Sequence, residues 1–378
     1  MIIEKFLNWV ECADTAERVS ATYALARAYL QSEMSIDERC SAEAALTFLL
    51  DDPSPKVRQA LAEVFSTSAI APAQIINALA GDQVEIASLV ILRSPQLTDL
   101  DLIDRVAMGD EAIQQLVALR PQISKIVAAA IAEVGGLEAC WELVGNEGAD
   151  IARLSLRRIC ERHGHDGAFR EYLLNDGRLP ADCRHALVTK HGQALSELAI
   201  VRALMGQARA QRVTRDASIR ACLNMVETVD PAEYGALVEH LRLSGDLTTG
   251  FVIRALAHGK IEFFGSILAA LTEEEPQRVN AMLANGREAA LKALFGKSGF
   301  SDTVNGILLQ GLQNWRAVAN GRLDAGPQEV ARLMMAELEK SRPHIGHAND
   351  DLMALLRGIY LDAMRDNSRN HAVAIAAA

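Results

Sequence analysis

The sequence has 378 residues with a formal net charge of -11, and half of its residues are hydrophobic although only 4% are aromatic. A chain of this length exceeds the usual size of a single core, so we expect two domains or an array of stacked units. The acidic charge argues against general nucleic-acid binding, and the composition, rich in Ala and Leu and without alternating apolar and polar residues, argues against a β-sandwich. The composition therefore predicts an all-α protein.

The cysteines and the N-terminal residues bear on the expected location of the protein. The six cysteines are scattered singly and include no C-x-x-C pair, which is typical of reduced thiols in a cytoplasmic protein. Residues 1–14 contain Glu4 and Glu11 and no small-residue cleavage site, so we expect an amphipathic helix there rather than a signal peptide. The longest uncharged apolar runs, such as residues 126–132, are far shorter than the roughly 20 residues that span a bilayer. The expected location is the cytoplasm, without a membrane span.

The clearest helix signal lies in residues 51–65. Ser54 is a favourable N-cap residue, and Pro55 suits the first helical position because its φ angle is already helical and its missing N–H would have no partner there. The apolar residues that follow recur at helical spacing and form one stripe: Val57, Ala60, Leu61, Val64 and Phe65. The pattern resembles the second helix of a HEAT-type repeat, in the residues Asp52, Pro53, Val57, Arg58 and Leu61. This resemblance implies a solenoid of stacked helix pairs.

Similar start signals recur along the N-terminal part of the chain. Capping-box pairs are expected at Asp14 with Glu17 and at Ser35 with Glu38. Together with the apolar periodicity and the turn residues, they predict helices over 2–12, 15–30, 41–50, 55–65, 74–80, 84–92, 111–119, 149–162 and 181–190.

Five Asp or Asn residues divide this part of the chain at similar intervals. Asp52, Asp82, Asp110, Asn146 and Asp176 are separated by 30, 28, 36 and 30 residues. This period is shorter than the roughly 40 to 47 residues of HEAT and armadillo units, so the repeats would be trimmed or irregular. Each helix pair would need its neighbours to cover its apolar face. An irregular helical domain with Gly-Asp turns is the alternative interpretation.

From about residue 196 the helices become longer, and we place a domain boundary between residues 200 and 201. Residues 1–200 are predicted to form a HEAT-like helical repeat domain, an α-solenoid, and residues 201–378 a helical bundle domain. The helices expected beyond the repeats cover 198–207, 216–228, 231–243, 249–258, 261–271, 273–284, 287–295, 301–320, 327–341 and 350–365.

One segment of the second half resembles a known family. The residues that carry the resemblance are Leu247, Thr248, Arg254, Ala255, Leu256, Gly259, Phe263, Phe264, Ala289, Leu291, Lys292, Ala293, Leu294 and Gly299. They are similar to the recurring pattern of an uncharacterised bacterial family, a domain of unknown function whose members carry HEAT-like helices. The resemblance implies an all-α fold, and it implies no activity, cofactor or catalytic residue.

Residues with sulfur or imidazole side chains gather in one part of the sequence: Cys160, His163, His165, Cys183, His185 and His191. Such side chains are zinc ligands, and stacked helices could bring several of them together. The spacing lacks the tight ligand pairs of structural zinc sites, so buried thiols and a His at a helix C-terminus are the favoured interpretation. We therefore expect no metal and no cofactor.

Two histidines, His240 and His258, are candidate phospho-acceptors, since a helical bundle that passes phosphoryl groups needs an exposed His on a helix. Neither lies in a complete phosphotransfer motif. His258 precedes Gly259 at a helix end, where a His is ordinary. A phosphorelay role is therefore an alternative to the main prediction.

The remaining signal is a basic zone in this acidic chain. Residues 151–220 contain thirteen Lys or Arg against seven Asp or Glu. Arg153 and Arg157 are four residues apart and share one helix face, which neighbouring repeats could extend into a ridge. The predicted partner-binding ridge comprises Arg153, Arg157, Arg158, Arg162, Arg170, Arg178 and Arg184. A solvated face paired with Glu161, Glu171 and Asp182 is the alternative.

No constellation of catalytic residues is found in the sequence, so the expected function is non-enzymatic. We expect a protein-protein interaction scaffold or adaptor in bacterial signalling that binds an acidic protein partner through the arginine ridge. The alternatives are a two-component or phosphorelay component that acts through the C-terminal bundle, and a HEAT-like nucleic-acid-binding or repair protein. The basic zone offers only Phe169 and Tyr172 for stacking on bases, which argues against nucleic acid.

Overall fold

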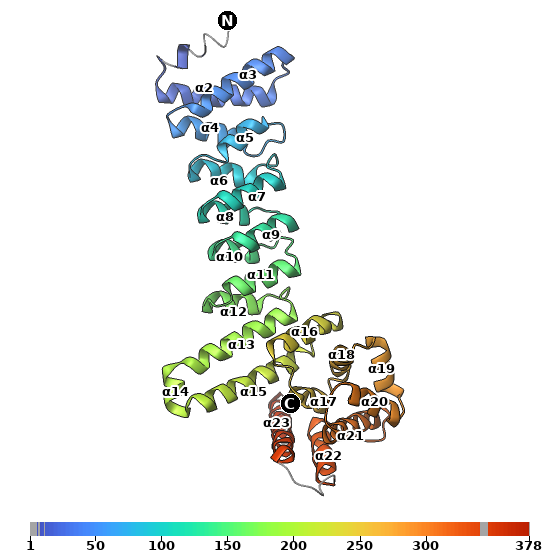
Figure 1. Ribbon diagram of the computed structural model, residues 1–378. Helices are drawn as coiled ribbons and strands as arrows, with labels where there is room; N and C mark the ends of the chain where they lie inside the picture. Colours follow the sequence, from blue (N-terminus) through green and yellow to red (C-terminus); the bar gives the residue numbers. More distant parts are fainter. Residues whose placement is uncertain (1–5, 7, 11, 341–346, 378) are drawn as a thin grey trace. The chain divides into compact units, whose positions relative to one another are not determined.

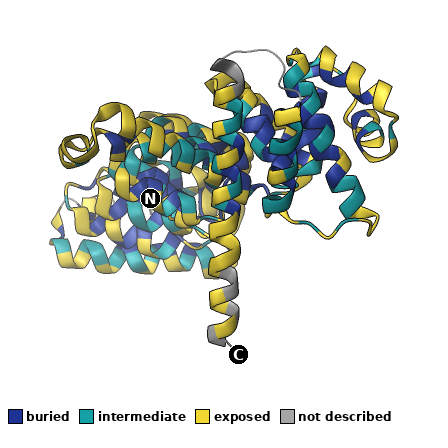
Figure 2. Cartoon of the chain, turned by 90° about the horizontal axis from the view of Figure 1, so that it is seen from below, coloured by how far each residue is buried: buried dark blue, intermediate teal, exposed yellow. Residues whose placement is uncertain are grey.

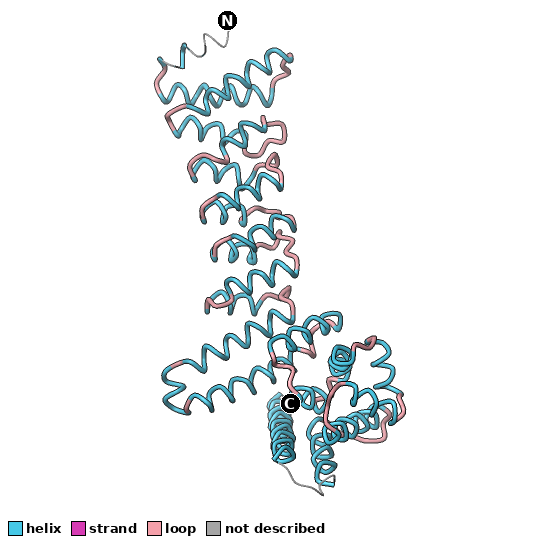
Figure 3. Tube along the Cα trace, in the orientation of Figure 1, coloured by secondary structure: helices cyan, strands magenta, loops and turns pink. Residues whose placement is uncertain are grey.

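The computed structural model describes residues 6, 8–10, 12–340 and 347–377, and the regular elements in these ranges are helices (Figure 3). An isolated bridge between Ile123 and Ala149 is the extended pairing found there. The all-α prediction is confirmed, although the helix expected over 2–12 lies largely outside the described residues. None of the helices in the described ranges has the length and hydropathy needed to cross a membrane.

The chain forms two compact units, Met1–Leu179 and Pro180–Ala378. The sequence placed the division between residues 200 and 201, which in the structure lies within α14 (Ala199–Met205). This short helix joins α13 (Ala181–Glu197) to α15 (Gln207–Met225), and the two longer helices pack against each other. Because α13 packs on α15, it belongs with the second unit, which therefore begins before α13.

The first unit consists of short helices stacked in two columns (Figure 1). Its elements are α2 (Thr15–Gln31), α3 (Ile36–Phe48), η1 (Leu49–Asp51), α4 (Pro55–Phe65), α5 (Ala73–Leu79), α6 (Val84–Arg93), α7 (Asp99–Met108), α8 (Glu111–Ala118), α9 (Lys125–Val134), α10 (Leu137–Gly145), α11 (Arg153–His163) and α12 (Gly167–Asn175). One column contains α2, α4, α6, α8 and α10, each packed on the next, and α7, α9 and α11 stack in the other. Helices this short depend on their neighbours for stability, because nucleation is unfavourable in isolation.

Helix starts follow the capping signals in part. The two capping boxes predicted at the starts of α2 and α3 are confirmed. Pro55 lies in the first turn of α4 as predicted, but the Ser54 side chain makes no capping hydrogen bond. The Asp52 carboxylate instead accepts a hydrogen bond from the Ser54 N–H at 2.8 Å.

The apolar stripe predicted for α4 is its buried face. Val57, Leu61 and Phe65 are fully buried, and the ring of Tyr29 from α2 meets the Phe65 ring edge-on. Figure 2 shows buried residues where the helices face one another and exposed residues on the outer faces. Full burial of one such side chain contributes about 1.5–3 kcal/mol, so packing within the stack is the main source of stability for α4.

The five Asp and Asn positions are not equivalent points of one repeat. Asp52, Asp82 and Asp110 precede α4, α6 and α8, whereas Asn146 precedes α11 and Asp176 precedes α13. The 36-residue step from Asp110 to Asn146 contains three short helices, α8, α9 and α10, while the steps of 28 and 30 residues contain two each. Asn146 therefore leads into the column of α7, α9 and α11, and the first three residues lead into the other column.

The second unit has longer helices around an aromatic core. Its elements after α15 are η2 (Pro231–Glu233), α16 (Tyr234–Ser244), α17 (Thr249–Ala257), α18 (Ile261–Thr272), α19 (Pro276–Asn285), α20 (Glu288–Lys297), α21 (Asp302–Ala319), α22 (Pro327–Lys340) and α23 (His347–Ala377). Phe251, Phe263, Phe264 and Phe295 are fully buried in this core. The helices α21, α22 and α23 pack on one another in chain order.

Candidate partner-binding surface

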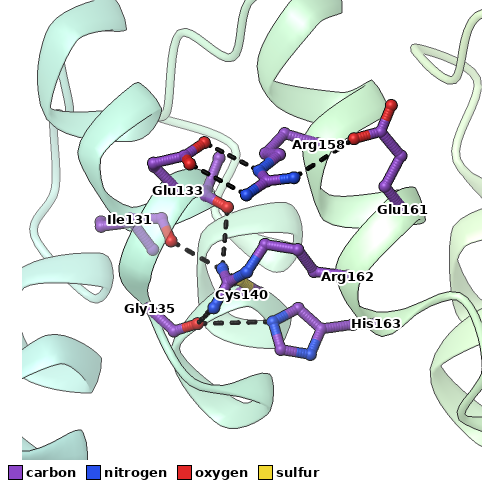
Figure 4. Close-up of polar contacts among 9 residues, drawn as sticks. Ile131, Glu133, Gly135, Cys140, Arg158, Glu161, Arg162 and His163 are labelled. Atoms are coloured by element: carbon purple, nitrogen blue, oxygen red, sulfur yellow. Dashed lines mark hydrogen bonds and ion pairs between the residues drawn. The ribbon is translucent and has the colours of Figure 1, made fainter.

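Arginine side chains in the first unit hold the C-terminal ends of neighbouring helices. The last carbonyl groups of a helix have no partner within it, and a cation placed there also complements the helix dipole. Arg162 of α11 donates to the carbonyl oxygens of Ala132 at 2.8 Å and Gly135 at 2.9 Å, at the end of α9 (Figure 4). This arginine therefore serves as a C-terminal cap supplied by another helix.

The same contact recurs along the stack. Arg105 of α7 binds two carbonyl oxygens at the end of α5, both at 2.8 Å, and Arg120, which follows α8, binds two at the end of α6. Burial lowers the pKa of both guanidinium groups. Asn146, after α10, and Arg178, after α12, donate to the ends of α8 and α10. Each capping side chain lies on, or directly after, the second helix beyond the helix whose end it binds. The contacts therefore link every helix end concerned to a helix two places later in the chain.

Two ion pairs link the first helices in a similar way. Arg18 of α2 pairs with Asp52 at 2.7 Å, and Arg58 of α4 pairs with Asp82 at 2.6 Å. Burial raises the pKa of the Asp82 carboxyl, but the hydrogen bonds from Arg58 and from the N–H of Gln83 outweigh it, and the pKa lies below its usual value. Two of the residues proposed as repeat markers, Asp52 and Asp82, thus bind arginines of earlier helices.

Three of the seven predicted ridge residues bind backbone carbonyl groups: Arg162, Arg170 and Arg178. Arg170 is buried, and its guanidinium group lies 3.4 Å from the carbonyl oxygen of Gly164 and 3.3 Å from that of His165. The ridge residues of the first unit are therefore not all on one exposed surface. The sequence could not separate these arginines from exposed ones, because most of the carbonyl groups they bind belong to helices far away in the chain.

The other ridge residues are less buried than Arg170. Arg158 forms ion pairs with Glu133 of α9 at 2.8 Å and with Glu161 at 3.4 Å (Figure 4). The hydrogen bond with Glu133 raises the pKa of Arg158. The remaining members are Arg153 and Arg157, exposed on α11, and Arg184, half-buried on α13 of the second unit.

The Cys and His residues considered as metal ligands are divided between the two units. In the first unit Cys160 is buried, and burial lowers the pKa of His163. In the second unit Cys183 and His185 are buried. The remaining members, His165 and His191, are exposed. Across the described ranges, no group of three or more His, Cys, Asp or Glu side chains is arranged to hold a metal ion.

His185 lines a polar cavity in the second unit that the sequence did not predict. The cavity has a volume of about 670 Å³ between α13 and α15, and its lining includes Ser196 and Arg212. The His185 Nδ1 atom and the Thr189 hydroxyl oxygen are buried there without a hydrogen-bond partner among the described residues. Burial, together with the His240 ring at 5.3 Å, lowers the pKa of His185 to about 4. A neutral imidazole can bond to water or to a small polar molecule in this space.

The two histidines considered as phospho-acceptors are both half-buried. His258 is the C-cap residue of α17, and burial lowers its pKa. The ring of His240 packs against that of His185. A phosphoryl-accepting role for either side chain stays a prediction.

Exposed aliphatic side chains recur at one position of the second column. Leu100, Ile126 and Leu154 are the second residues of α7, α9 and α11, and they are 72%, 54% and 73% exposed. Because these helices stack in one column, the three side chains lie at the same end of successive helices. This row was not predicted, since a single apolar residue in a first helical turn does not show whether it faces the core. The signal that could have found the row is that each of its residues lies two positions after the N-cap of its helix.

A family model matches the chain across parts of both units. The model of the family described as an uncharacterised protein conserved in bacteria, DUF2336, matches residues 86–347, more than half of the chain. No match was found among curated proteins or among solved structures. The resemblance to an uncharacterised bacterial family is thereby confirmed, while the HEAT type of the repeats stays a prediction.

Proposed function

The chain belongs to the uncharacterised bacterial family DUF2336, and we propose that it is a non-enzymatic scaffold that binds a protein partner through its first unit. The stacked helix pairs of this unit form a HEAT-like array in the proposal, and the scaffold acts in cytoplasmic signalling. The observation that carries the proposal is the row of Leu100, Ile126 and Leu154. Large aliphatic side chains exposed at one position of successive helices are typical of an interaction surface.

The dimensions of this row suit an amphipathic helix of the partner. Stacked helices lie about 8–10 Å apart, so the row is roughly 20 Å long. An α-helix of about four turns has that length and can present apolar residues at every third or fourth position. Such a helix would bury the three side chains together. A single exposed leucine elsewhere on the surface offers a much smaller apolar contact.

The charges beside the row favour an acidic segment at one end. Lys125 and Arg153 directly precede Ile126 and Leu154, and Arg157 lies exposed one turn further along α11. Lys125 also forms an exposed ion pair with Asp150 at 3.6 Å. Asp99 precedes Leu100 at the other end. The partner helix is therefore expected to carry acidic residues where it meets α9 and α11, in agreement with the acidic partner expected from the sequence.

Replacing all three row residues with Gln is expected to abolish partner binding without unfolding the chain. The side chains are exposed, so the change removes little buried area, whereas the complex loses its apolar contacts and weakens roughly hundredfold. The measurement is affinity capture from the native cell with wild-type bait, followed by the dissociation constant of the captured partner for wild-type and Leu100→Gln/Ile126→Gln/Leu154→Gln proteins.

The matched control replaces two equally exposed leucines outside the first unit, as Leu243→Gln/Leu361→Gln. A second variant, Arg153→Glu/Arg157→Glu, is expected to slow association and to reverse its salt dependence. Equal dissociation constants for the wild type and the row variant would overturn the proposal, as would a bait that captures no protein beyond the control.

A further inference from the structure

The short connection between α13 and α15 exposes several large apolar side chains. None of the residues of α14 is buried. Ile200 and Leu204 are 67% and 78% exposed, and because they are four residues apart they share one face of the helix. The neighbouring exposed residues are Leu195, Leu198, Met205 and Val213. Large apolar side chains that are exposed together on one short segment mark a place where a protein meets a partner or a membrane.

Basic side chains accompany this apolar surface. Residues 198–215 contain Arg202, Arg209, Arg212 and Arg215 and no acidic residue, in a chain whose net charge is -11. All four arginines are exposed, and none forms an ion pair with another described residue. The segment therefore carries a local positive charge. Glu197 and Asp246 line the same cavity as Arg212 and Arg215 but form no ion pair with them among the described residues.

Three of the four arginines lie farther from the end of the hairpin than Ile200 and Leu204, whereas Arg202 lies on α14 with them. The helices α13 and α15 pack side by side, and α14 closes one end (Figure 1). Arg209, Arg212 and Arg215 follow Met205 by four to ten residues, which places them roughly 6–15 Å back along α15. The headgroup layer outside the hydrocarbon core of a bilayer is roughly 5–7 Å thick. If α14 rests at the edge of the acyl chains, Arg209 lies among the phosphates, and the long side chains of Arg212 and Arg215 can reach them.

From this arrangement we propose that the α13–α15 hairpin docks on an anionic membrane surface, with Ile200 and Leu204 inserted and the four arginines bound to lipid phosphates. Short amphipathic helices with cationic residues beside apolar ones bind at the boundary between headgroups and acyl chains. Each arginine near an anionic surface adds attraction, and the apolar side chains add burial that charge alone does not supply. The proposal does not depend on the scaffold function, whose row lies on α7, α9 and α11.

A membrane fits the segment better than a nucleic acid or a protein. No aromatic residue occurs between Leu195 and Ile219, so the segment lacks side chains that stack on bases. The aliphatic tip has no role in binding nucleic-acid phosphates. Lipid, by contrast, accommodates flexible aliphatic side chains and arginines without a shaped partner surface.

The test is co-flotation of the full chain with vesicles of phosphatidylcholine alone and of phosphatidylcholine mixed with phosphatidylglycerol. The wild type is expected to float with the mixed vesicles only, and to be released by added salt. The variant Arg209→Gln/Arg212→Gln/Arg215→Gln is expected to bind roughly hundredfold more weakly. The variant Ile200→Ser/Leu204→Ser is expected to lose at least about tenfold. Both sets of residues are exposed, so both variants are expected to fold.

Two further measurements separate insertion from surface attraction. The variant Leu204→Trp adds one tryptophan fluorophore to the tip, and its fluorescence is obtained by subtracting the wild-type spectrum. Lipids brominated on their acyl chains are expected to quench this fluorescence if the tip is inserted. The matched control Leu243→Ser, in another exposed position, is expected to bind as the wild type does. Absence of binding to the mixed vesicles would overturn the proposal and leave an acidic protein as the occupant. Equal binding by the wild type and the tip variant, or binding that is insensitive to salt, would also overturn it.

Discussion

Replacing Arg162 with Met is expected to lower the free energy of unfolding by about 3 kcal/mol. The guanidinium group donates to the carbonyl oxygens of Ala132 and Gly135, and these two hydrogen bonds are charge-assisted. Met retains an apolar stem but no donor, so the loss reports on the hydrogen bonds and the helix dipole rather than on packing. The measurement is urea-induced unfolding near neutral pH, followed by circular dichroism.

The adjacent turn of α11 offers a matched control. Arg158 also forms hydrogen bonds, but they go to the exposed carboxylates of Glu133 and Glu161, which water can satisfy after the arginine is removed. The Arg158→Met variant is therefore expected to lose only a small fraction of the stability that Arg162→Met loses. Coincident urea midpoints for the two variants would show that the carbonyl contacts of Arg162 stabilise the fold no more than the exposed ion pairs of Arg158 do.

The His185→Gln variant is expected to remove part of the acid sensitivity of the protein. Burial, the neighbouring His240 and the opposing influence of Asp246 together lower the pKa of His185 from 6.5 to about 4 in the folded chain. Between these two values the unfolded chain binds a proton that the folded chain does not, so the free energy of unfolding falls as the pH falls through this window. The full loss below pH 4 is about 3 kcal/mol relative to neutral pH.

A pH series of urea unfolding curves tests this expectation. His185→Gln has no imidazole to protonate at this position, so its stability should decline less than that of the wild type between pH 6.5 and 4, and the two curves should converge or cross. His191→Gln, an exposed position on the same helix, serves as the control and should run parallel to the wild type. If the His185→Gln curve also runs parallel to the wild type, the buried imidazole is not the source of the acid sensitivity.

Some arginines of the basic zone have a structural role and do not belong to a binding surface. Arg162, Arg170 and Arg178 belong to the internal hydrogen-bond network of the first unit, which leaves Arg153 and Arg157 as exposed members of the predicted ridge there. Further along the chain, Arg209, Arg212 and Arg215 supply the exposed positive charge. The excess of arginine in residues 151–220 thus combines arginines that bind backbone carbonyl groups with arginines whose side chains are exposed.

Much of the fold could be predicted because helix signals are local. The stripe of Val57, Leu61 and Phe65 repeats every three to four residues, and Pro55 starts the helix through its own backbone geometry. These features depend on residues within one segment, so they hold in any arrangement of the helices. The period of Asp and Asn residues was less reliable, because its spacing cannot tell two short helices from three.

The candidate sites depended on contacts between segments. A guanidinium group near a helix end looks the same in sequence whether it faces solvent or, like Arg162, caps a helix about 30 residues earlier. The same holds for His185, which is buried beside a polar cavity only because α13 packs against α15 and α16. The sequence by itself determined that the chain is helical and where many of its helices begin, since those signals act within a few residues, but it did not predict α7, α9, α10 and α12. Only the tertiary structure decided which charged and apolar side chains remain exposed, because exposure depends on neighbours that are distant in the chain.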